Sequence, residues 1–528
     1  MVLLILCAAL TVHFFYLFAP PVTAHSSTRT IVQQEGTLAP SAPIKPTSVS
    51  VINFAELAAR DAKASKEIRP DAAPVLRAVH PPKTITEGDS AIAARPASTT
   101  PQGNEIHPLV SSPAPSQSFL AQEDGPEVGT GTFDIPPDTM GAVGPDKLFV
   151  NVNSNYRVQD KTTGAALSTV SIETLWASSG ASGVFDPRAQ YDPYNNRWIL
   201  AATSNSGTGS SSILVAVSAT SDPQGTFTLF RFTVGCAAGS ANCDASGETA
   251  DFPMLGFNKN WVAVGWNQFQ ISGSGSFVAG KMLAIDYPTL RTGTATSTVF
   301  SVGLLTNSAA FCMHPATTLS ATEETLYAPA HLSSASATYR LHKIIGTPSA
   351  PVYVLDTVSK TRTGGAWTPP SGDILPQSCV GTPGTTCPTT RRSIDSGDAF
   401  IRSNVVFRNN NIWYPQTVGL PAGGLSHTGA QWTEIDTSGN FVDGGRVEDP
   451  TASSLTGEWY AYPSLAVNVN NDVLLGFSNF GASHFARAAY ASRQGSDAAG
   501  TMRDPVVFKE GDDYYSKDFG GVRNSWGD

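Results

Sequence analysis

The chain has 528 residues, of which 14% are charged, with 47 glycines, 37 prolines and a formal net charge of −10. Abundant Gly and Pro with few charges favour an all-β, turn-rich protein, and the length leaves room for more than one domain. The acidic balance and the dispersed Lys and Arg residues argue against a nucleic-acid-binding protein, because no basic stripe is present to neutralise phosphates.

Residues 1–24 have the pattern of a secretory signal peptide. The apolar run MVLLILCAALTVHFFYLFAPP is followed by the small-residue site Val22-Thr23-Ala24. An uncleaved membrane anchor is the alternative. No later stretch is apolar enough to span a bilayer, so we expect a secreted or surface-attached monomer with no membrane span once the signal is removed.

Residues 25–120 are rich in Pro, Ala, Ser and Thr, as in HPPKTITEGDSAIAARPASTTPQG. Such a composition buries too little apolar surface to offset the entropy of the chain, which predicts a disordered linker or pro-segment. Within it, VINFAELAARDAKASKEI is amphipathic and predicts a transient helix at most. The amino-acid composition changes near residue 121, where we expect the folded domain 121–528 to begin.

A β-hairpin pattern recurs along this domain. Each copy has a polar or aromatic residue beside Pro, an apolar strand, a turn of Asn, Asp, Gly or Lys, and a second apolar strand, as in YPSLAVNVNNDVLLGFSN. The copies begin at Pro136, Asp186, Phe252, His314, Gly397 and Tyr462. One hairpin cannot bury its own apolar face, so repeated hairpins must stack on neighbours or close into a ring.

The repeats have room for four short strands each, which favours a β-propeller. A string of immunoglobulin-like sandwiches is the rival, but it needs longer repeats. We therefore predict an all-β propeller of four-stranded blades, seven in number with six as the alternative. The sequence stops at RNSWGD, where another copy would begin, and this predicts truncation before the last hairpin.

The cysteines agree with export. CAAGSANC and CVGTPGTTC place Cys236 close to Cys243, and Cys379 close to Cys387, which suits two disulfide-closed loops in an oxidising compartment. Other pairings remain open. Cys312 is then the odd residue, expected to be a buried thiol.

Propeller geometry predicts where a site would be, because the start of the innermost strand of each blade faces the central channel. The residues at or beside this position are Asp138, Asp186, Arg188, Asp251, His314, Asp398, Arg402, Tyr462 and Asp528. Carboxylates gathered at a channel mouth would have raised pKa values or would require a cation, for which Ca²⁺ suits oxygen ligands best. Asp138, Asp186 and Asp251 are the candidate metal ligands. The alternative is that each Asp caps its own turn.

Exposed aromatic residues stack on sugar rings, and two of them lie in a loop before a blade. Trp459 and Tyr460 are therefore the candidate ligand-contact aromatics, whereas the strand residues Trp198, Trp261 and Trp413 are expected to pack between blades.

Several stretches resemble a family of secreted bacterial β-propellers that is grouped loosely with sialidase-like propellers. They are PPDTMGAVGPDKLFVNVN, FDPRAQYDPYNNRWILAA, SGDAFIRSNVVFRNNNIWY, WYAYPSLAVNVNNDVLLGFS and RNSWGD, and the resemblance covers roughly residues 125–528. It implies the fold and no established reaction. The segment from Ser393 to Phe400 also matches a sialidase Asp-box, S-x-D-x-G-x-x-W/F, in a single copy; such boxes are structural turns.

Sialidase catalysis needs three arginines around a carboxylate and a Tyr–Glu pair. The candidates are Arg188, Arg402, Arg487 and Arg523, with Tyr460 or Tyr462 and Glu458, and their alternative role is in surface or inter-blade ion pairs.

The sequence leaves two hypotheses about function. The first is binding of a glycan, peptide or protein ligand at the channel face, with Ca²⁺ as a candidate cofactor. The alternative is a glycoside hydrolase acting at the same face. The residues alone do not decide whether the protein is an enzyme.

Overall fold

The computed structural model describes residues 43–65, 75–78, 110–128, 132–241, 243–273, 275–303, 310–378, 393–453, 456–517 and 524–527. These belong to one compact unit, Gln34–Asp528. The predicted signal peptide, the second predicted disulfide, Arg523 and Asp528 lie outside the described residues. Within those residues, no helix has the length and apolar character that crossing a membrane requires.

The described chain is built mainly from antiparallel sheets in which consecutive strands are neighbours. The first sheet contains β4 (Met140–Val143), β5 (Lys147–Asn151), β6 (Asn155–Asp160) and β7 (Ala166–Ser171). The second contains β8 (Phe185–Asp192), β9 (Arg197–Ser204), β10 (Ser212–Ser218) and β11 (Thr226–Thr233), with β1 (Ser48–Asn53) added at its edge. The last contains β27 (Trp459–Val467), β28 (Val473–Gly481), β29 (His484–Arg493) and β30 (Val506–Lys509).

Between these lie two further four-stranded runs and a smaller sheet. The runs are β12 (Glu248–Phe257), β13 (Trp261–Gln270), β14 (Phe277–Asp286) and β15 (Ser297–Gly303), and then β23 (Val406–Arg408), β24 (Asn411–Leu420), β25 (His427–Asp436) and β26 (Phe441–Val447). The smaller sheet contains β17 (Leu326–His331), β18 (Thr338–Thr347), β19 (Ala350–Val354) and β20 (Lys360–Thr361). The short β16 (Thr317–Thr318) pairs in parallel with both β12 and β23 and so joins the two runs.

The remaining elements are short. They are the parallel pair β2 (Val75–Ala78) and β3 (Thr132–Ile135), the antiparallel pair β21 (Asp373–Leu375) and β22 (Ile394–Asp395), and the helices α1 (Phe54–Ser65), α2 (Ile172–Trp176), η1 (Ala177–Ser179) and α3 (Tyr287–Leu290).

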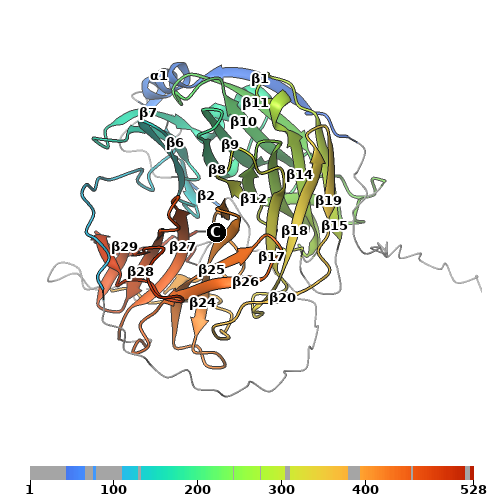
Figure 1. Ribbon diagram of the computed structural model, residues 1–528. Helices are drawn as coiled ribbons and strands as arrows, with labels where there is room; N and C mark the ends of the chain where they lie inside the picture. Colours follow the sequence, from blue (N-terminus) through green and yellow to red (C-terminus); the bar gives the residue numbers. More distant parts are fainter. Residues whose placement is uncertain are drawn as a thin grey trace, which may run out of the picture. The chain divides into compact units, whose positions relative to one another are not determined.

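Figure 1 shows the successive sheets side by side around a common centre, which is the arrangement of a β-propeller. The predicted all-β fold is confirmed, with at least four blades. The predicted number of seven, and the truncation, stay predictions. Apolar side chains pack between neighbouring sheets, and the fully buried residues include Trp198, Trp261 and Trp413 as expected.

The hairpins form for the reason that the sequence suggests. Between β27 and β28, the side-chain oxygen of Asn468 accepts the backbone N–H groups of Asn470 and Asp472, at 2.8 and 3.0 Å. Asn471 has φ +63°, a left-handed conformation that Asn adopts more readily than most residues. The turn therefore pairs Val467 with Val473 and sets the register of both strands.

Besides β2, two pieces that lie wholly or partly in the predicted disordered segment 25–120 are folded. β1 pairs along its length with β11, from Ser48 opposite Arg231 to Asn53 opposite Thr226. In α1, Phe54 is fully buried, its ring centroid 5.5 Å from that of Phe149. The local composition does not predict this pairing, because the partner strand β11 lies far along the chain.

The second piece, residues 110–128, joins the last sheet to the first, and we call it the strap. At one end, the strap residue Ser112 accepts the backbone N–H of Ser492 in β29 at 2.9 Å, and the hydroxyl of Tyr490 donates to Pro113 O. At the other end, Gln159 in β6 donates to Leu120 O at 2.9 Å. Figure 1 shows the strap running between β29 and the sheet of β6 and β7.

Candidate functional site

The starts of several inner strands share an unusual backbone conformation. Positive φ values near +50° occur at Asp138, Asp186, Phe252, Cys312 and Tyr462. Such a value is uncommon outside Gly, and for a bulky side chain it is a genuine outlier. Outliers of this kind cluster at functional sites, where the surrounding structure holds the strain.

At three of these positions the inner strand also bulges. The register shifts between Phe185 and Arg188 in β8, between Asp251 and Met254 in β12, and between Ala461 and Ser464 in β27. A bulge leaves one residue without a ladder partner and redirects its side chain. In all three strands Pro follows the positive-φ residue. The repeated X-Pro pairs are therefore the feature of the sequence that coincides with these bulges.

Hydrogen bonds join three of these strained residues to the sheet before them. Asn153 accepts the N–H of Asp186 at 2.7 Å, and Asn267 accepts that of Cys312 at 3.0 Å. Thr417 accepts that of Tyr462 at 2.9 Å. The acceptors lie at the end of β13 or β24 or just after β5, so each bond ties two sheets together beside the centre.

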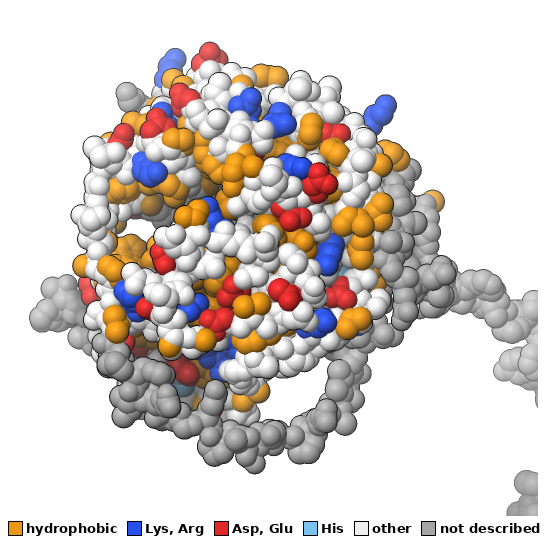
Figure 2. All heavy atoms as spheres, in the orientation of Figure 1, with side chains coloured by type: hydrophobic (Ala, Val, Ile, Leu, Met, Phe, Trp, Pro, Cys, Tyr) orange, Lys and Arg blue, Asp and Glu red, His pale blue; other side chains and the backbone are white. Residues whose placement is uncertain are grey.

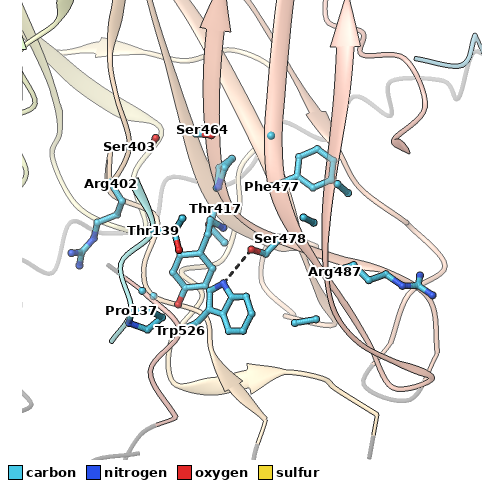
Figure 3. A pocket seen from close by; sticks show the side chains of 18 of the residues that line it. Pro137, Thr139, Arg402, Ser403, Thr417, Ser464, Phe477, Ser478, Arg487 and Trp526 are labelled. Carbon is cyan, nitrogen blue, oxygen red and sulfur yellow. Dashed lines mark hydrogen bonds between the residues drawn. The ribbon is translucent and has the colours of Figure 1, made fainter. Parts of the chain in front are cut away.

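A pocket of about 640 Å³ opens at this level, between β4 and the sheet of β27–β29. Ser464 and Ser478 line it from β27 and β28, and Thr139 lines it from the start of the first sheet (Figure 3). Trp526 also lines the pocket, and its indole N–H donates to the hydroxyl of Ser478 at 3.1 Å. Small polar side chains, an aromatic ring and backbone are thus all available to a ligand.

Four of the predicted channel-mouth residues line this pocket: Asp138, Asp398, Arg402 and Tyr462. Asp138 accepts a hydrogen bond from Asn153 Nδ2 at 2.7 Å. Asp398 pairs with Arg402 through Nε, at 3.1 Å, and through Nη2, and it also accepts the N–H of Phe400 at 2.8 Å. Asp398 therefore caps its own turn, as the alternative interpretation expects.

The other predicted residues lie at the inner strands but not in the pocket. Asp186, Arg188, Asp251 and His314 are all buried. Burial lowers the pKa of His314 to about 3, and the positive charge of Arg188 acts in the same direction, against the backbone groups of Ile401 and Leu255. His314 is therefore neutral at physiological pH.

Two of the candidate arginines of a sialidase site, Arg402 and Arg487, do not converge. Arg402 and Arg487 both line the pocket, but their guanidinium groups point away from each other (Figure 3). Arg487 instead pairs with Glu510 at 2.7 Å and lies 3.8 Å from Glu458. Arg188 is not among the lining residues.

The Asp-box match forms a local turn. Asp395 is buried, and its carboxylate accepts the N–H of Gly397 at 3.2 Å. Its backbone carbonyl accepts the hydroxyl of Tyr462 at 2.6 Å. The box therefore helps to position Tyr462 at the pocket wall.

The structure corrects the prediction that Trp459 and Tyr460 contact a ligand. Trp459 is 3% exposed and donates its indole N–H to Ser453 O at 2.9 Å. Tyr460 is 6% exposed and packs on Phe477, with centroids 5.1 Å apart. Both rings are used in packing at the start of β27, so neither presents a face to a ligand. The aromatic residues that line the pocket are Phe400, Tyr462, Phe477, Phe508, Tyr515 and Trp526.

The predicted calcium ligands do not form a compact set. In the described part of the chain, three potential ligands lie within 4.8 Å of one another only at Cys236, Cys243 and Glu248. Cys236 and Cys243 form the disulfide that the sequence predicted, so their sulfurs are not available to a metal. Cys312 is a buried thiol, also as predicted.

The surface electrostatics match the composition. On the face drawn in Figure 2, acidic and basic side chains are interspersed, with no basic stripe over any set of elements. This face therefore offers no counterpart to a phosphate backbone.

Comparisons with known proteins add little. No family model matches the chain, and no curated protein matches it. Among solved structures, a variant of Synechocystis apocarotenoid oxygenase is 11% identical over 71% of this chain and 72% of its own, with a TM-score of 0.37. A neuraminidase-like protein from A/bat/Guatemala is 8% identical over 73% of this chain and 94% of its own, with a TM-score of 0.36. Neither value supports an argument about function.

Proposed function

We propose that this protein is a secreted or surface-attached β-propeller that binds a glycan or peptide ligand in the pocket beside Tyr462. The observation that carries the proposal is the pocket itself, where Asp138, the Asp398–Arg402 pair and Tyr462 meet from separate sheets. Pockets that combine an apolar lining with a few convergent polar groups are the usual sites of ligand binding.

The location outside the cell is supported by the Cys236–Cys243 disulfide, since disulfides persist in oxidising compartments. The proposed molecule acts as a monomer. Ca²⁺ stays a candidate cofactor of this proposal, although the carboxylate oxygens of Asp138, Asp186 and Asp251 do not lie within 4.8 Å of one another.

The blade number belongs to the same proposal. The sheets of β4–β7 and β27–β30 each leave apolar residues exposed, at Val143 (60%), Leu167 (42%), Leu474 (49%) and Phe508 (43%). In a closed propeller both faces of each blade are covered by neighbours. One further sheet between these two would cover such faces, but it would also fill the pocket, which Phe508 lines; the proposed pocket therefore goes with the six-bladed alternative.

A hydrolase is not proposed. Arg402 and Arg487 point apart, and burial raises the pKa of Tyr460 well above its ordinary value, which keeps its hydroxyl protonated. No nucleophile with a lowered pKa and an adjacent base stands in the described part of the pocket.

The test fills the pocket without disturbing the core. Ser464 and Ala466 are both exposed on the same face of β27, but only Ser464 lines the pocket. A glycan array and a peptide array on the wild-type protein give the ligand. Ser464→Trp is expected to weaken binding of that ligand at least tenfold, whereas Ala466→Trp leaves it unchanged. Equal affinities in the two variants would place binding elsewhere.

A further inference from the structure

Arg188 is a buried cation whose two terminal nitrogens have no hydrogen-bond partner. The residue is 4% exposed, and its Nε donates to Pro253 O at 2.9 Å. Nη1 and Nη2 are buried and make no hydrogen bond. Leaving the N–H groups of a buried guanidinium unmatched is costly, and natural proteins pair such groups with acceptors.

Two buried carboxylates lie on the inner strands near Arg188, Asp186 in β8 and Asp251 in β12, but neither forms an ion pair with it. Its guanidinium lies over the ring of Phe252, 4.8 Å from the centroid, and that of Arg402 lies 4.6 Å from the same centroid. His314 is neutral because burial and Arg188 both lower its pKa. Arg402 has its own partner in Asp398, at 3.1 Å, but Arg188 forms no such ion pair with the described residues.

The surroundings come from three different inner strands. Arg188 belongs to β8, Phe252 and Pro253 to β12, and His314 precedes β16. Two of these residues lie at the bulges described above, and Phe252 has φ +55°. A ligand here would therefore contact two sheets and the segment before β16, at the point where strain is concentrated.

We propose that Arg188 holds a small anion, a halide or an oxyanion, at the centre of the ring between β8 and β12. Its two terminal nitrogens form the fork that binds planar or spherical anions well. The anion would neutralise the buried charge and hold the three inner strands together. This site goes beyond the proposed function, since a propeller can contain it whether or not the pocket binds a glycan or peptide.

The test is thermal unfolding of the full chain in a buffer with only bulky anions, titrated with chloride, nitrate or phosphate at constant ionic strength. An anion that binds only the folded state raises Tm in a saturable way, by roughly 3 °C at a hundredfold excess over Kd for a domain of this size. We expect this rise with at least one of the three anions, and the anion that gives it separates halide from oxyanion.

Arg188→Met is expected to lose the rise, and Arg157→Met is the matched control. Arg157 also donates to a backbone carbonyl, Ala121 O, but lies on β6 and not at an inner strand. Arg188→Lys keeps the charge without the fork and should saturate only at higher anion concentration, so it serves if Arg188→Met does not fold.

Crystals of the wild-type protein soaked in bromide give a second measurement, with an anomalous peak expected roughly 3.5 Å from the Arg188 nitrogens. Absence of any saturable rise in the wild type, or an equal rise in Arg188→Met, would overturn the proposal.

Discussion

At the scale of single residues, the side chains that join neighbouring sheets matter most. Asn153 is fully buried and uses its whole amide: Nδ2 donates to Pro136 O and to Asp138, and Oδ1 accepts the N–H of Asp186. No apolar residue can replace these bonds, so the strained conformation of Asp186 depends on one side chain in the preceding sheet.

Asn153→Ala is expected to lower the free energy of unfolding by about 2–4 kcal/mol, because it leaves several buried polar groups unmatched at about 1–3 kcal/mol each. Urea unfolding measures the loss. Asn470→Ala is the control, since Asn470 is exposed in a turn without a positive φ and should change stability by less than about 0.5 kcal/mol. Equal losses in the two variants would contradict the linking role of Asn153.

The contribution of Glu434 to stability falls as the pH rises, which is the opposite of the usual case for a carboxylate. Burial raises its pKa to about 7, with Asp443 acting in the same direction and Asn411 and Arg493 against it. Between its ordinary value of 4.5 and about 7, the folded state holds a proton that the unfolded state has released. Stability from this group is therefore complete below about pH 4.5 and is lost as the pH rises through 7.

Glu434→Gln keeps an oxygen that can accept the amide of Asn411 but cannot ionise. Its stability relative to the wild type is therefore expected to improve from pH 5 to pH 8, as measured by urea unfolding at both values. A difference that does not change with pH would show that Glu434 is not protonated in the folded state.

At the scale of secondary-structure elements, β1 forms part of the second blade and α1 packs on the first, although both lie far before these blades in the sequence. Phe54 packs on Phe149, and Asp61 of α1 accepts the N–H of Ser171 at 2.8 Å. Burial raises the pKa of Asp61, so its carboxylate takes up a proton at a higher pH than an exposed Asp does.

Phe54→Ala is expected to cost about 3–5 kcal/mol, the usual loss for a large aromatic residue removed from a core. Val51→Ala is the control on the same segment, because Val51 is 64% exposed and its loss should fall within about 0.5 kcal/mol. Denaturant unfolding of both variants tests whether this segment is part of the folded domain. A small effect of Phe54→Ala would restore the predicted disordered linker.

The same elements show what the sequence can and cannot predict. The hairpins were predictable because turn residues such as Asn468 and the strands they join are adjacent in sequence. β1 was missed because its pairing partner begins at Thr226, and composition alone does not show such a contact. Trp459 and Tyr460 were misplaced because a position before a strand says nothing about burial. The X-Pro pairs, by contrast, marked the strained inner-strand residues correctly.

At the scale of the whole domain, the strap holds together the two sheets that flank the pocket. It bonds to Ser492 and Tyr490 in β29 and to Gln159 in β6. Asp124, near its end, pairs with Lys517 and also lines the pocket. The pocket therefore has a wall that is separate from the sheets.

Cutting the strap tests this role. A protease site inserted after the exposed Ser116 allows cleavage of the folded protein. Amide exchange is then expected to quicken in β6, β7, β29 and β30 and to stay unchanged in β13 and β14, with the uncut insertion variant as control. Uniform acceleration would mean general unfolding, and no acceleration would mean that the sheets hold their places without the strap.

The strap also affects the order in which contacts can form during biosynthesis. Pro113 leaves the ribosome early, but its partner Tyr490 is made 377 residues later. At about 5–20 residues per second, the nascent chain spends roughly 20–75 seconds with this contact unmade. During that interval the strap is not bound to the last sheet, so the first blade depends on chaperones or on its own local stability. The contact that joins the first and last sheets therefore becomes possible only long after the first blade has been made.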